Sequence, residues 1–490
     1  MSSLAADASP DGPHGAGAPR LWQNLWVRLA VALAFADASI VVLALPQIVD
    51  RLHTTISHST WVIMAYNLAL IVTSALVATV GRRLPSTATL VAGLIVFGLA
   101  SIGCGASGSL GLLIALRCLQ GVGGALVLAA SLPVFAGAAR PGDSPLQGWS
   151  AAAAIGAAIG PAAGGVLTQL FDWRSIFFAQ APVAAVAAVA VMIVRREARR
   201  EIAAEADRPP SELDPVAANL GLLLLSASLI GALFLVVIEL INAWQLTPIG
   251  AAAVVSGIPL STAAAERLVR GRSAVLLGAT GAVLLALGLV LLALPTHRQV
   301  ALAVIGLVLC GLGLGLAYPG LTAAALESGG STTTRAAKTV AARDLGLVIG
   351  LLILTPVFVT RLNSVISNQA PVQEAEAAVI VAPLSPAVKG PLIGHLLSAL
   401  NAAGTTNLPD VDPVFAAAEP AAGPADRAQL AILKAKLDAI VAQTQGQLTH
   451  SFRRPFAYAA IFALLVLPLL ALRRVFARRR DSEPSAPATV

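Results

Sequence analysis

The chain has 490 residues, of which 57% are apolar and only 12% are charged, with a mean hydropathy of +0.82. A soluble chain of this length carries about twice that charged fraction, so the composition excludes the soluble globular class and indicates a polytopic membrane protein. We attribute the net charge of +7 to arginine-rich loops beside anionic membrane lipids, and expect no nucleic-acid partner.

Apolar runs long enough to cross a membrane predict an all-α protein of about twelve spanning helices. Residues 1–20, which precede them, are rich in Ser, Ala, Gly and Pro, so we expect a disordered cytoplasmic N-terminus. The predicted spans lie near residues 27–48, 61–80, 88–106, 110–136, 149–170, 175–194, 216–241, 247–264, 273–295, 299–325, 338–360 and 455–475.

A polar linker over residues 195–215 divides the spans into two sets of six. We therefore predict two six-helix bundles, over residues 21–194 and 216–475, with a cytoplasmic tail at 476–490. Such an outline is typical of a transporter with its site between the bundles, near the midplane of the membrane. Arginine-rich loops gather on one side, so the positive-inside rule predicts a multi-pass protein of the plasma (inner) membrane with both termini in the cytoplasm.

One long segment, residues 361–454, is expected to leave the membrane on the extracytoplasmic side. Its first part contains many prolines and is predicted to be irregular, whereas its second part has apolar residues at helical spacing. The sequence favours a surface loop packed loosely on the outer mouth, with a substrate-handling cap as the alternative. These features rest on Pro371, Pro383, Pro386 and Pro391, and on Leu430, Leu433, Leu437, Ile440 and Val441.

Two charged residues fall where the hydrocarbon of the membrane is expected. A helix entering near Trp26 places Asp37 roughly 16 Å deep, and a helix entering from the other face near Leu110 places Arg117 about 10 Å deep. An ionisable side chain at such depth is costly, so both residues are candidate functional residues. The alternative is a buried pair that only fixes two helices together.

Small residues form a stripe along the fifth span, where Gly156, Gly160 and Gly164 recur every four residues beside Pro161 and Gly165. A face without side chains lets another backbone approach closely. From spacing alone, plain helix packing and a role in gating are equally open.

The other motifs exclude classes of protein. The glycines of residues 311–315 resemble a nucleotide loop but lie within an apolar run with no strand before them. Tyr318, which follows, is expected to line a pore wall. Glu239 is expected near the outer end of the seventh span, as a substrate contact or an interfacial carboxylate. No nucleophile–base set, Walker loop or metal cluster occurs in the sequence. We therefore expect that the protein is neither an enzyme nor an ATP-driven pump, and that it binds no cofactor and no metal.

Four signatures in the expected order resemble the drug:proton antiporter branch of the major facilitator superfamily. The first span matches over residues 37–46, the second over 61–68, the fourth over 113–124 and the fifth over 156–165, followed by Trp173, Arg174, Phe177 and Pro182. The resemblance covers the whole chain except the long outer segment. It departs from the family in the loop at residues 81–85, which lacks the family's aspartate, and at Gln147, where the fifth-span signature has its first glycine.

The resemblance implies two six-helix bundles that export small amphipathic or hydrophobic compounds by alternating access, driven by inward proton flow. Asp37 would be the proton carrier and Arg117 would tune it, while Tyr66, Gln120, Glu239 and Tyr318 are the candidate substrate contacts. The partners implied are protons, a small amphipathic substrate or lipid, and membrane lipids, and we expect a monomer. Two rival functions remain open: an exporter or flippase of a lipid or glycolipid, and a transport-dead sensor or scaffold.

Overall fold

The computed structural model describes residues 17–138, 145–193, 213–266, 268–269, 272–327, 330–366, 370–403 and 411–472. These residues are helical almost throughout and contain no strand. Most of the N-terminus and of the linker predicted at 195–215, and the whole tail predicted at 476–490, lie outside the described residues. The predictions for those segments therefore stay predictions.

The first half of the chain forms six long helices, which make up one bundle. A single 3₁₀ turn, η1 (Gly81–Arg83), links the second and third of them. The helices are α1 (Gly17–Arg51), α2 (Ile56–Val80), α3 (Ser86–Ala106), α4 (Leu110–Ala138), α5 (Pro145–Leu170) and α6 (Ser175–Ile193).

The second half forms the other bundle, in which two spans are interrupted. One span is divided between α8 and α9, and the last is divided between α17 and α18. The elements are α7 (Pro215–Ile238) with a π-helical turn η2 (Glu239–Ala243), α8 (Pro248–Val255), α9 (Gly257–Glu266), α10 (Ala274–Leu292), α11 (Val300–Ala325), α12 (Thr332–Ile366), α17 (Arg453–Leu464) and α18 (Val466–Ala471).

The predicted all-α membrane fold is confirmed. Among the described residues, eleven stretches are long and apolar enough to cross a membrane. The remaining predicted span, 149–170, is α5, a helix of 26 residues that packs against α1 in the first bundle.

Local sequence explains where several of these helices begin. The Asp214 side chain accepts hydrogen bonds from the backbone N–H of Val216 and Ala217, and Pro215 occupies the first turn of α7. Thr247 and Pro248 start α8 in the same way. A capping oxygen satisfies orphan donors, and proline costs nothing where the helix needs no N–H.

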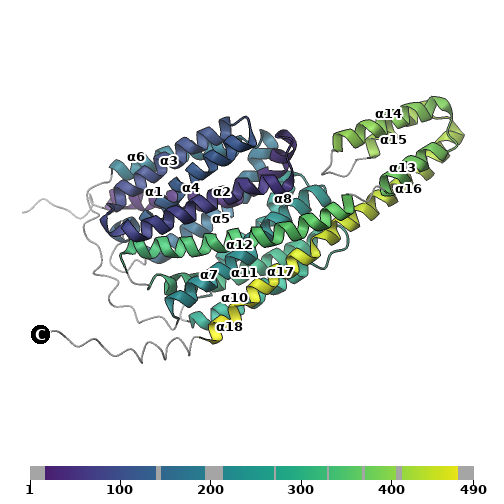
Figure 1. Ribbon diagram of the computed structural model, residues 1–490. Coiled ribbons are helices and arrows are strands. Elements are labelled where there is room, and N and C mark those ends of the chain that lie inside the picture. Colours follow the sequence, from purple (N-terminus) through teal and green to yellow (C-terminus); the bar gives the residue numbers. More distant parts are fainter. Residues whose placement is uncertain are drawn as a thin grey trace, which may run out of the picture.

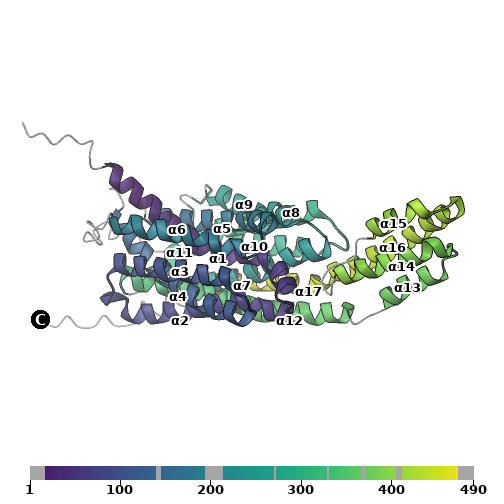
Figure 2. The same cartoon turned by 90° about the horizontal axis from the view of Figure 1, so that it is seen from above.

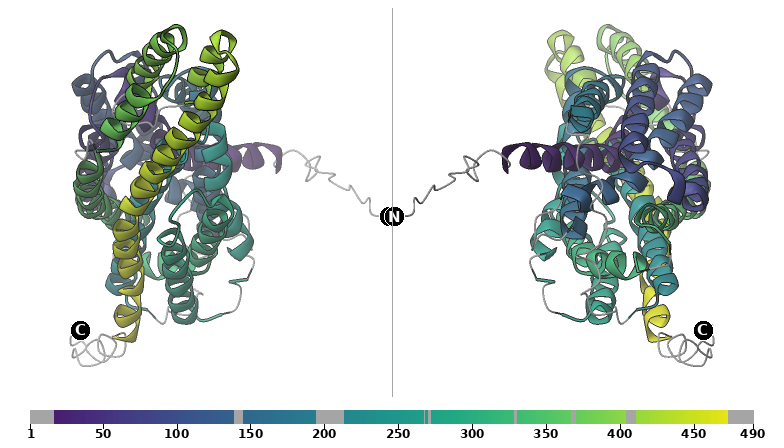
Figure 3. Two further views of the ribbon diagram at one scale, coloured as in Figure 1. Left: turned by 90° about the vertical axis from the view of Figure 1, so that its right-hand side faces the viewer. Right: turned by 90° about the vertical axis from the view of Figure 1, so that its left-hand side faces the viewer.

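The two bundles lie side by side, and α12 runs along the boundary between them. In Figure 1 the purple and blue helices of the first half lie above the green α12, and α7, α10, α11 and α17 of the second half lie below it. Figure 3, seen along the long axis, shows the same two groups end on. Helix α12 packs on α2 and α4 of the first bundle and on α7 of the second. It therefore contributes to both halves of the core.

The bundles touch at both ends of the molecule. At the end where Gly17 and Leu472 lie, which we call the termini end, a Cβ on Gly81 would lie 3.3 Å from the Thr333 and Thr334 side chains of α12. At the opposite end the backbone N–H of Ile249 on α8 donates a 2.9 Å hydrogen bond to Oε1 of Gln169. The loop at residues 81–85, which lacks the family's aspartate, is thus packed against threonine side chains of α12.

The first part of the long segment, predicted to be irregular, is helical, so the prediction of a loosely packed loop is wrong there. The segment contains α13 (Ala370–Val381), α14 (Pro386–Ala403), α15 (Asp412–Ala418), a 3₁₀ turn η3 (Glu419–Ala421) and α16 (Pro424–Ser451). Figures 1 and 2 show these helices, which we call the extension, projecting beyond the end of the two bundles. Helix α16 leads almost directly into α17.

The prolines do not prevent helices in the extension because most of them stand at permitted positions. Pro371 and Pro386 lie in the first turns of α13 and α14, Pro383 lies between these helices, and only Pro391 is inside one. Proline is well tolerated in the first turn of a helix. The predicted amphipathic helix is α16, which buries Leu430, Leu433, Leu437 and Ile440 against Phe415, Val388 and Leu392. The extension therefore has an apolar core of its own.

Candidate functional site

Asp37 and Arg117 form an ion pair inside the first bundle. Nη1 of Arg117 lies 2.9 Å from Oδ1 and 2.7 Å from Oδ2 of Asp37, and both side chains are fully buried. The residues come from α1 and α4, and they meet because these helices bring them to similar depths from opposite faces. Two charges away from water are stable only when they are paired and further hydrogen-bonded.

A shell of amide and hydroxyl groups completes the site. Oδ1 of Asp37 accepts hydrogen bonds from Nε2 of Gln180 on α6 (3.0 Å) and Nε2 of Gln120 on α4 (3.3 Å). Gln120 also accepts from Arg117 Nη1 at 2.6 Å and donates to Gln180 at 2.7 Å and to Ser101 on α3 at 2.8 Å. Donors from α4 and α6 thus hold the carboxylate of α1, and Ser101 on α3 holds Gln120.

The second helix holds the guanidinium from the other side. Nε of Arg117 donates to the backbone carbonyl of Val62 at 2.9 Å, and the Tyr66 ring lies under the guanidinium, 4.4 Å from its centroid. The Phe177 ring lies 5.8 Å away on another side. Nη2 of Arg117 is buried without a hydrogen-bond partner among the described residues. The predicted residues Asp37, Arg117, Tyr66 and Gln120 therefore form one cluster.

This arrangement can hold a charged carboxylate in a dry site, since every oxygen of Asp37 faces a donor. A neutral acid in this place would remove the charge attraction to Arg117, which would still donate to Val62 and Gln120. Asp37 is fully buried, so its carboxylate has no contact with solvent in this conformation.

The other two predicted contacts lie elsewhere. Tyr318 is in the second bundle, where its hydroxyl forms a 2.6 Å hydrogen bond with the Ser226 hydroxyl on α7. Glu239 begins η2 and is 3% exposed, and its Oε1 has no hydrogen-bond partner among the described residues. The alternative of an exposed interfacial carboxylate is therefore wrong. The turn that carries it packs on α16, where Gln445 donates to the carbonyl of Ala243 at 2.8 Å.

The glycine stripe of α5 faces two different helices. A Cβ on Gly156 would lie 2.1 Å from the carbonyl of Ala32 on α1, and one on Gly164 would lie 2.8 Å from the carbonyl of Ile40. A Cβ on Gly165 would lie 2.4 Å from Cβ of Ala252 on α8. Gly160 and Pro161 are also buried. Close backbone approach thus joins α5 both to the helix of Asp37 and to the other bundle.

Sequence reasoning missed several polar residues within spans. Gln180 donates to Asp37, and Ser101 accepts from Gln120 beside the ion pair. Arg343 and Asp344 form a second pair inside α12, at 3.0 Å between Nη2 and Oδ1. The signal was available, because an ionisable or amide side chain within an apolar run is the same observation that identified Asp37. These residues were not predicted because none of the four family signatures includes them.

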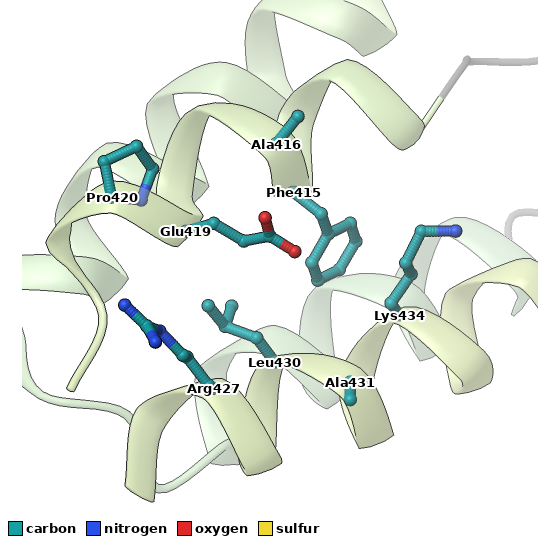
Figure 4. A pocket seen from close by; sticks show the side chains of 8 residues that line it. All are labelled: Phe415, Ala416, Glu419, Pro420, Arg427, Leu430, Ala431 and Lys434. Carbon is teal, nitrogen blue, oxygen red and sulfur yellow. The ribbon is translucent and has the colours of Figure 1, made fainter. Parts of the chain in front are cut away.

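A hollow of about 510 Å³ lies in the extension. Figure 4 shows the Phe415 ring and the Glu419 carboxylate projecting into it, with Leu430 and Arg427 on the facing helix. Lys434 at its edge is engaged by Asp412 at 2.6 Å and Asp438 at 3.0 Å. The hollow combines an apolar floor with a mixed-charge rim, and no group of three metal-ligating side chains lies in the described parts of the chain.

Two six-helix bundles, the first of which encloses a buried carboxylate–arginine pair, define the class of two-bundle membrane transporters. The chain belongs to the Major Facilitator Superfamily, whose sequence profile matches residues 28–353. The extension and the last span lie beyond that match.

Curated relatives include antibiotic resistance proteins. The chain is 32% identical over 227 residues to the tetracenomycin C resistance and export protein of Streptomyces glaucescens, covering 46% of this chain and 40% of that protein. It is 34% identical over 181 residues to the lincomycin resistance protein of Streptomyces lincolnensis, covering 35% and 36%. The matched region is thus about two-fifths of each relative's length or less.

A solved structure confirms the fold alone. A bacterial homologue of the human lysosomal transporter Spinster, in an inward-facing and occupied conformation, has a TM-score of 0.64 and 14% identity. The alignment covers 96% of this chain and the whole of that one.

Proposed function

We propose that this protein is a proton-coupled exporter of small amphipathic compounds that works by alternating access. The observation that carries the proposal is the fully buried Asp37–Arg117 pair, which is held by four helices of one bundle. The resistance functions named for its relatives support export of small compounds. Asp37 is the proton carrier, and Arg117 is the cation that competes with the proton.

The coupling follows from electrostatics. With Asp37 ionised, its pair with Arg117 ties α1 to α4, and through Val62 and Tyr66 to α2. A proton on Asp37 removes the attraction and loosens these helices relative to one another. The proton and the substrate drive the cycle only by binding one conformation more tightly than the other. Proton entry from outside and release inside would then accompany export.

Asp37→Asn tests the role of the carboxylate, because the amide cannot exchange a proton. Vesicles containing the variant would receive an imposed pH gradient, and substrate movement would be followed. We expect uphill export to be lost while binding remains. Asp172→Asn is the matched control, since that carboxylate is 43% exposed and pairs loosely with Arg174 at 3.7 Å. Uphill transport by Asp37→Asn at the wild-type rate would show that Asp37 is not the carrier, and Glu239 would be the next residue to test.

The proposed orientation places the termini end in the cytoplasm. A cysteine replacing Glu376, which is exposed on α13, should react with an impermeant thiol reagent added to intact cells. One replacing Arg83 in η1, also exposed, should react only after the membrane is opened. The reverse pattern would invert the topology.

A lipid or glycolipid exporter is a second candidate, favoured by the extension and its hollow of about 510 Å³. Export assays with a dye and with a fluorescent lipid separate the two. Phe415→Asp places a charge in the apolar core of the extension. If the protein exports lipids, this variant should lose lipid export only; if it exports small amphipathic compounds, the variant should keep the export of both probes.

A further inference from the structure

The ion pair inside α12 joins two neighbouring residues. Nη2 of Arg343 lies 3.0 Å from Oδ1 and 3.4 Å from Oδ2 of Asp344. Residues one apart on a helix point in directions about 100° apart and do not face each other. The pair therefore forms only because the long arginine side chain bends around the helix. Helix geometry alone does not hold Arg343 in this place.

An aromatic ring of the other bundle supplies the second contact. The Arg343 guanidinium lies 4.1 Å from the centroid of the Phe35 ring on α1. Phe35 in turn meets the Trp149 ring edge to face at 5.5 Å, and Trp149 Nε1 donates to the Ser131 hydroxyl at 3.0 Å. The Phe35 ring is thus held in place by Trp149, whereas no comparable contact holds the Arg343 guanidinium among the described residues.

The two arginines of the core differ in how firmly they are held. Arg117 is fully buried and is bonded to Asp37, Val62 and Gln120. The Arg343 side chain is 17% exposed, and its recorded polar partner among the described residues is Asp344 alone. Arg343 can therefore turn away without any change in the backbone, but Asp344, at 1% exposed, stays buried.

A buried carboxylate beside a fixed aromatic face is the chemistry by which proteins bind organic cations. The guanidinium of Arg343 now fills that place. If it leaves, Asp344 keeps a buried charge unpaired, which is strongly unfavourable. Another cation can therefore replace it, whereas a neutral molecule cannot.

The location connects this place to the coupling pair. Helix α12, which carries Arg343 and Asp344, packs on α2, which carries Tyr66. Tyr66 carries Arg117 on its face, and Phe35 precedes Asp37 by two residues on α1. A cation bound here would lie between the two bundles, next to the residues that hold Asp37.

We propose that Asp344 and the Phe35 ring form a binding site for lipophilic organic cations, in which Arg343 is an internal occupant that the cation displaces. The site rests on the proposed export function and names one substrate class for it. Arg343 acts as a tethered competitor, so that Asp344 is never left without a cation when the site is empty.

Binding of two matched compounds to the purified full chain in lipid nanodiscs tests this. Tetraphenylphosphonium is the cation, and triphenylphosphine oxide is a neutral compound of similar shape. Arg343→Gln should bind the cation about tenfold more tightly, equivalent to about 1.4 kcal/mol, because the competitor is gone. Asp344→Asn should bind it at least about tenfold more weakly. Neither change should alter binding of the neutral compound by more than a factor of about two.

Arg28→Gln is the matched control, because Arg28 lies over the Phe135 ring at 6.0 Å, elsewhere on α1, and the variant should bind as the wild type does. Opposite shifts for Arg343→Gln and Asp344→Asn support the site, since misfolding weakens both. Equal shifts for both compounds, or no cation binding by wild type and Arg343→Gln, overturn it. The assay needs no proton gradient, so it stands apart from the transport test: a wild-type protein that moves no substrate uphill in vesicles under an imposed pH gradient would overturn the exporter while these shifts remain.

Discussion

The two ion pairs of the membrane core have the same chemistry but opposite surroundings. Asp37 and Arg117 come from two helices and are enclosed by amides, a hydroxyl and a backbone carbonyl, with both side chains fully buried. Arg343 and Asp344 are neighbours on one helix, and the arginine is partly exposed. The first pair ties helices together, whereas the second ties a side chain to its own helix. Only the first has to be broken for the first bundle to change shape.

The extension offers a third environment for charge. Its ion pairs and capping contacts stand at the surface, where water screens them. Together the three regions define an order of expected effects, from the enclosed pair to the exposed cluster. Removing one partner at each place tests that order.

The largest effect is expected for Arg117→Met. It strands the Asp37 carboxylate in a dry site and should lower the free energy of unfolding by about 3–5 kcal/mol. The double variant Asp37→Asn/Arg117→Met removes both charges and should recover a large part of that loss. Thermal unfolding in one detergent would compare them. Equal melting of the single and double variants would show that the pair is not the source of stability.

Gln180→Leu should come next, because it takes one donor from Asp37 and one acceptor from Gln120. Leaving buried polar groups unpaired costs about 1–3 kcal/mol. Gln47→Leu is the matched control, since it removes a single 2.8 Å bond to the carbonyl of Thr168. A smaller melting shift for Gln180→Leu than for Gln47→Leu would contradict the enclosed character of the site.

Arg343→Gln should destabilise the fold less than Arg117→Met does. Glutamine removes the positive charge beside the buried Asp344 but still reaches it with a hydrogen-bond donor, so the expected loss is about 1–3 kcal/mol. Thermal unfolding in the same detergent would measure this loss of stability. A loss as large as that of Arg117→Met would show that Arg343 fixes the two bundles together and is not a displaceable cation.

The smallest effect is expected in the extension, at Asp426. Its side chain accepts hydrogen bonds from the backbone N–H (3.0 Å) and the hydroxyl (2.7 Å) of Ser385, and these bonds hold the pKa of Asp426 below its ordinary value of 3.8. The stabilisation is thus complete above that ordinary value and is lost as the pH falls through the lower folded value.

Hydrogen exchange of α14 and α16 between neutral pH and pH 3 would follow this loss. Asp426→Ala should exchange faster at neutral pH and show less change on acidification than the wild type. Asp438→Ala is the control, because Lys434 keeps Asp412 as a partner. Faster exchange in the membrane helices would show that the extension is not an independent unit.

Sequence patterns predicted more of the fold than of the site. The apolar runs predicted the twelve spans because a membrane demands about 20 apolar residues per helix, whatever the neighbouring helices do. The pattern of Leu430, Leu433 and Leu437 predicted α16 in the same way. The proline-rich part before it was misjudged, because a proline's effect depends on whether it falls in the first turn of a helix or inside it.

Asp37 and Arg117 were predicted from their position in apolar runs, and Tyr66 and Gln120 were added as candidate substrate contacts. The structure brings these four residues together. Gln180 and Asp344 were equally visible as polar residues in apolar runs, but their importance depends on what faces them. Glu239 and Tyr318 were grouped with the others by residue type, and the structure places Tyr318 against Ser226 and Glu239 beside α16.

The sequence by itself determined that this chain crosses a membrane, where the spans lie, and that Asp37 and Arg117 need a reason to be there. These follow from the cost of exposing polar groups to hydrocarbon, which each segment meets alone. Only the tertiary structure decided which charge meets which, that Arg117 is enclosed while Arg343 is not, and that Phe35 stands against Arg343. Those outcomes depend on the rotation and packing of helices far apart in the chain, and no local pattern specifies them.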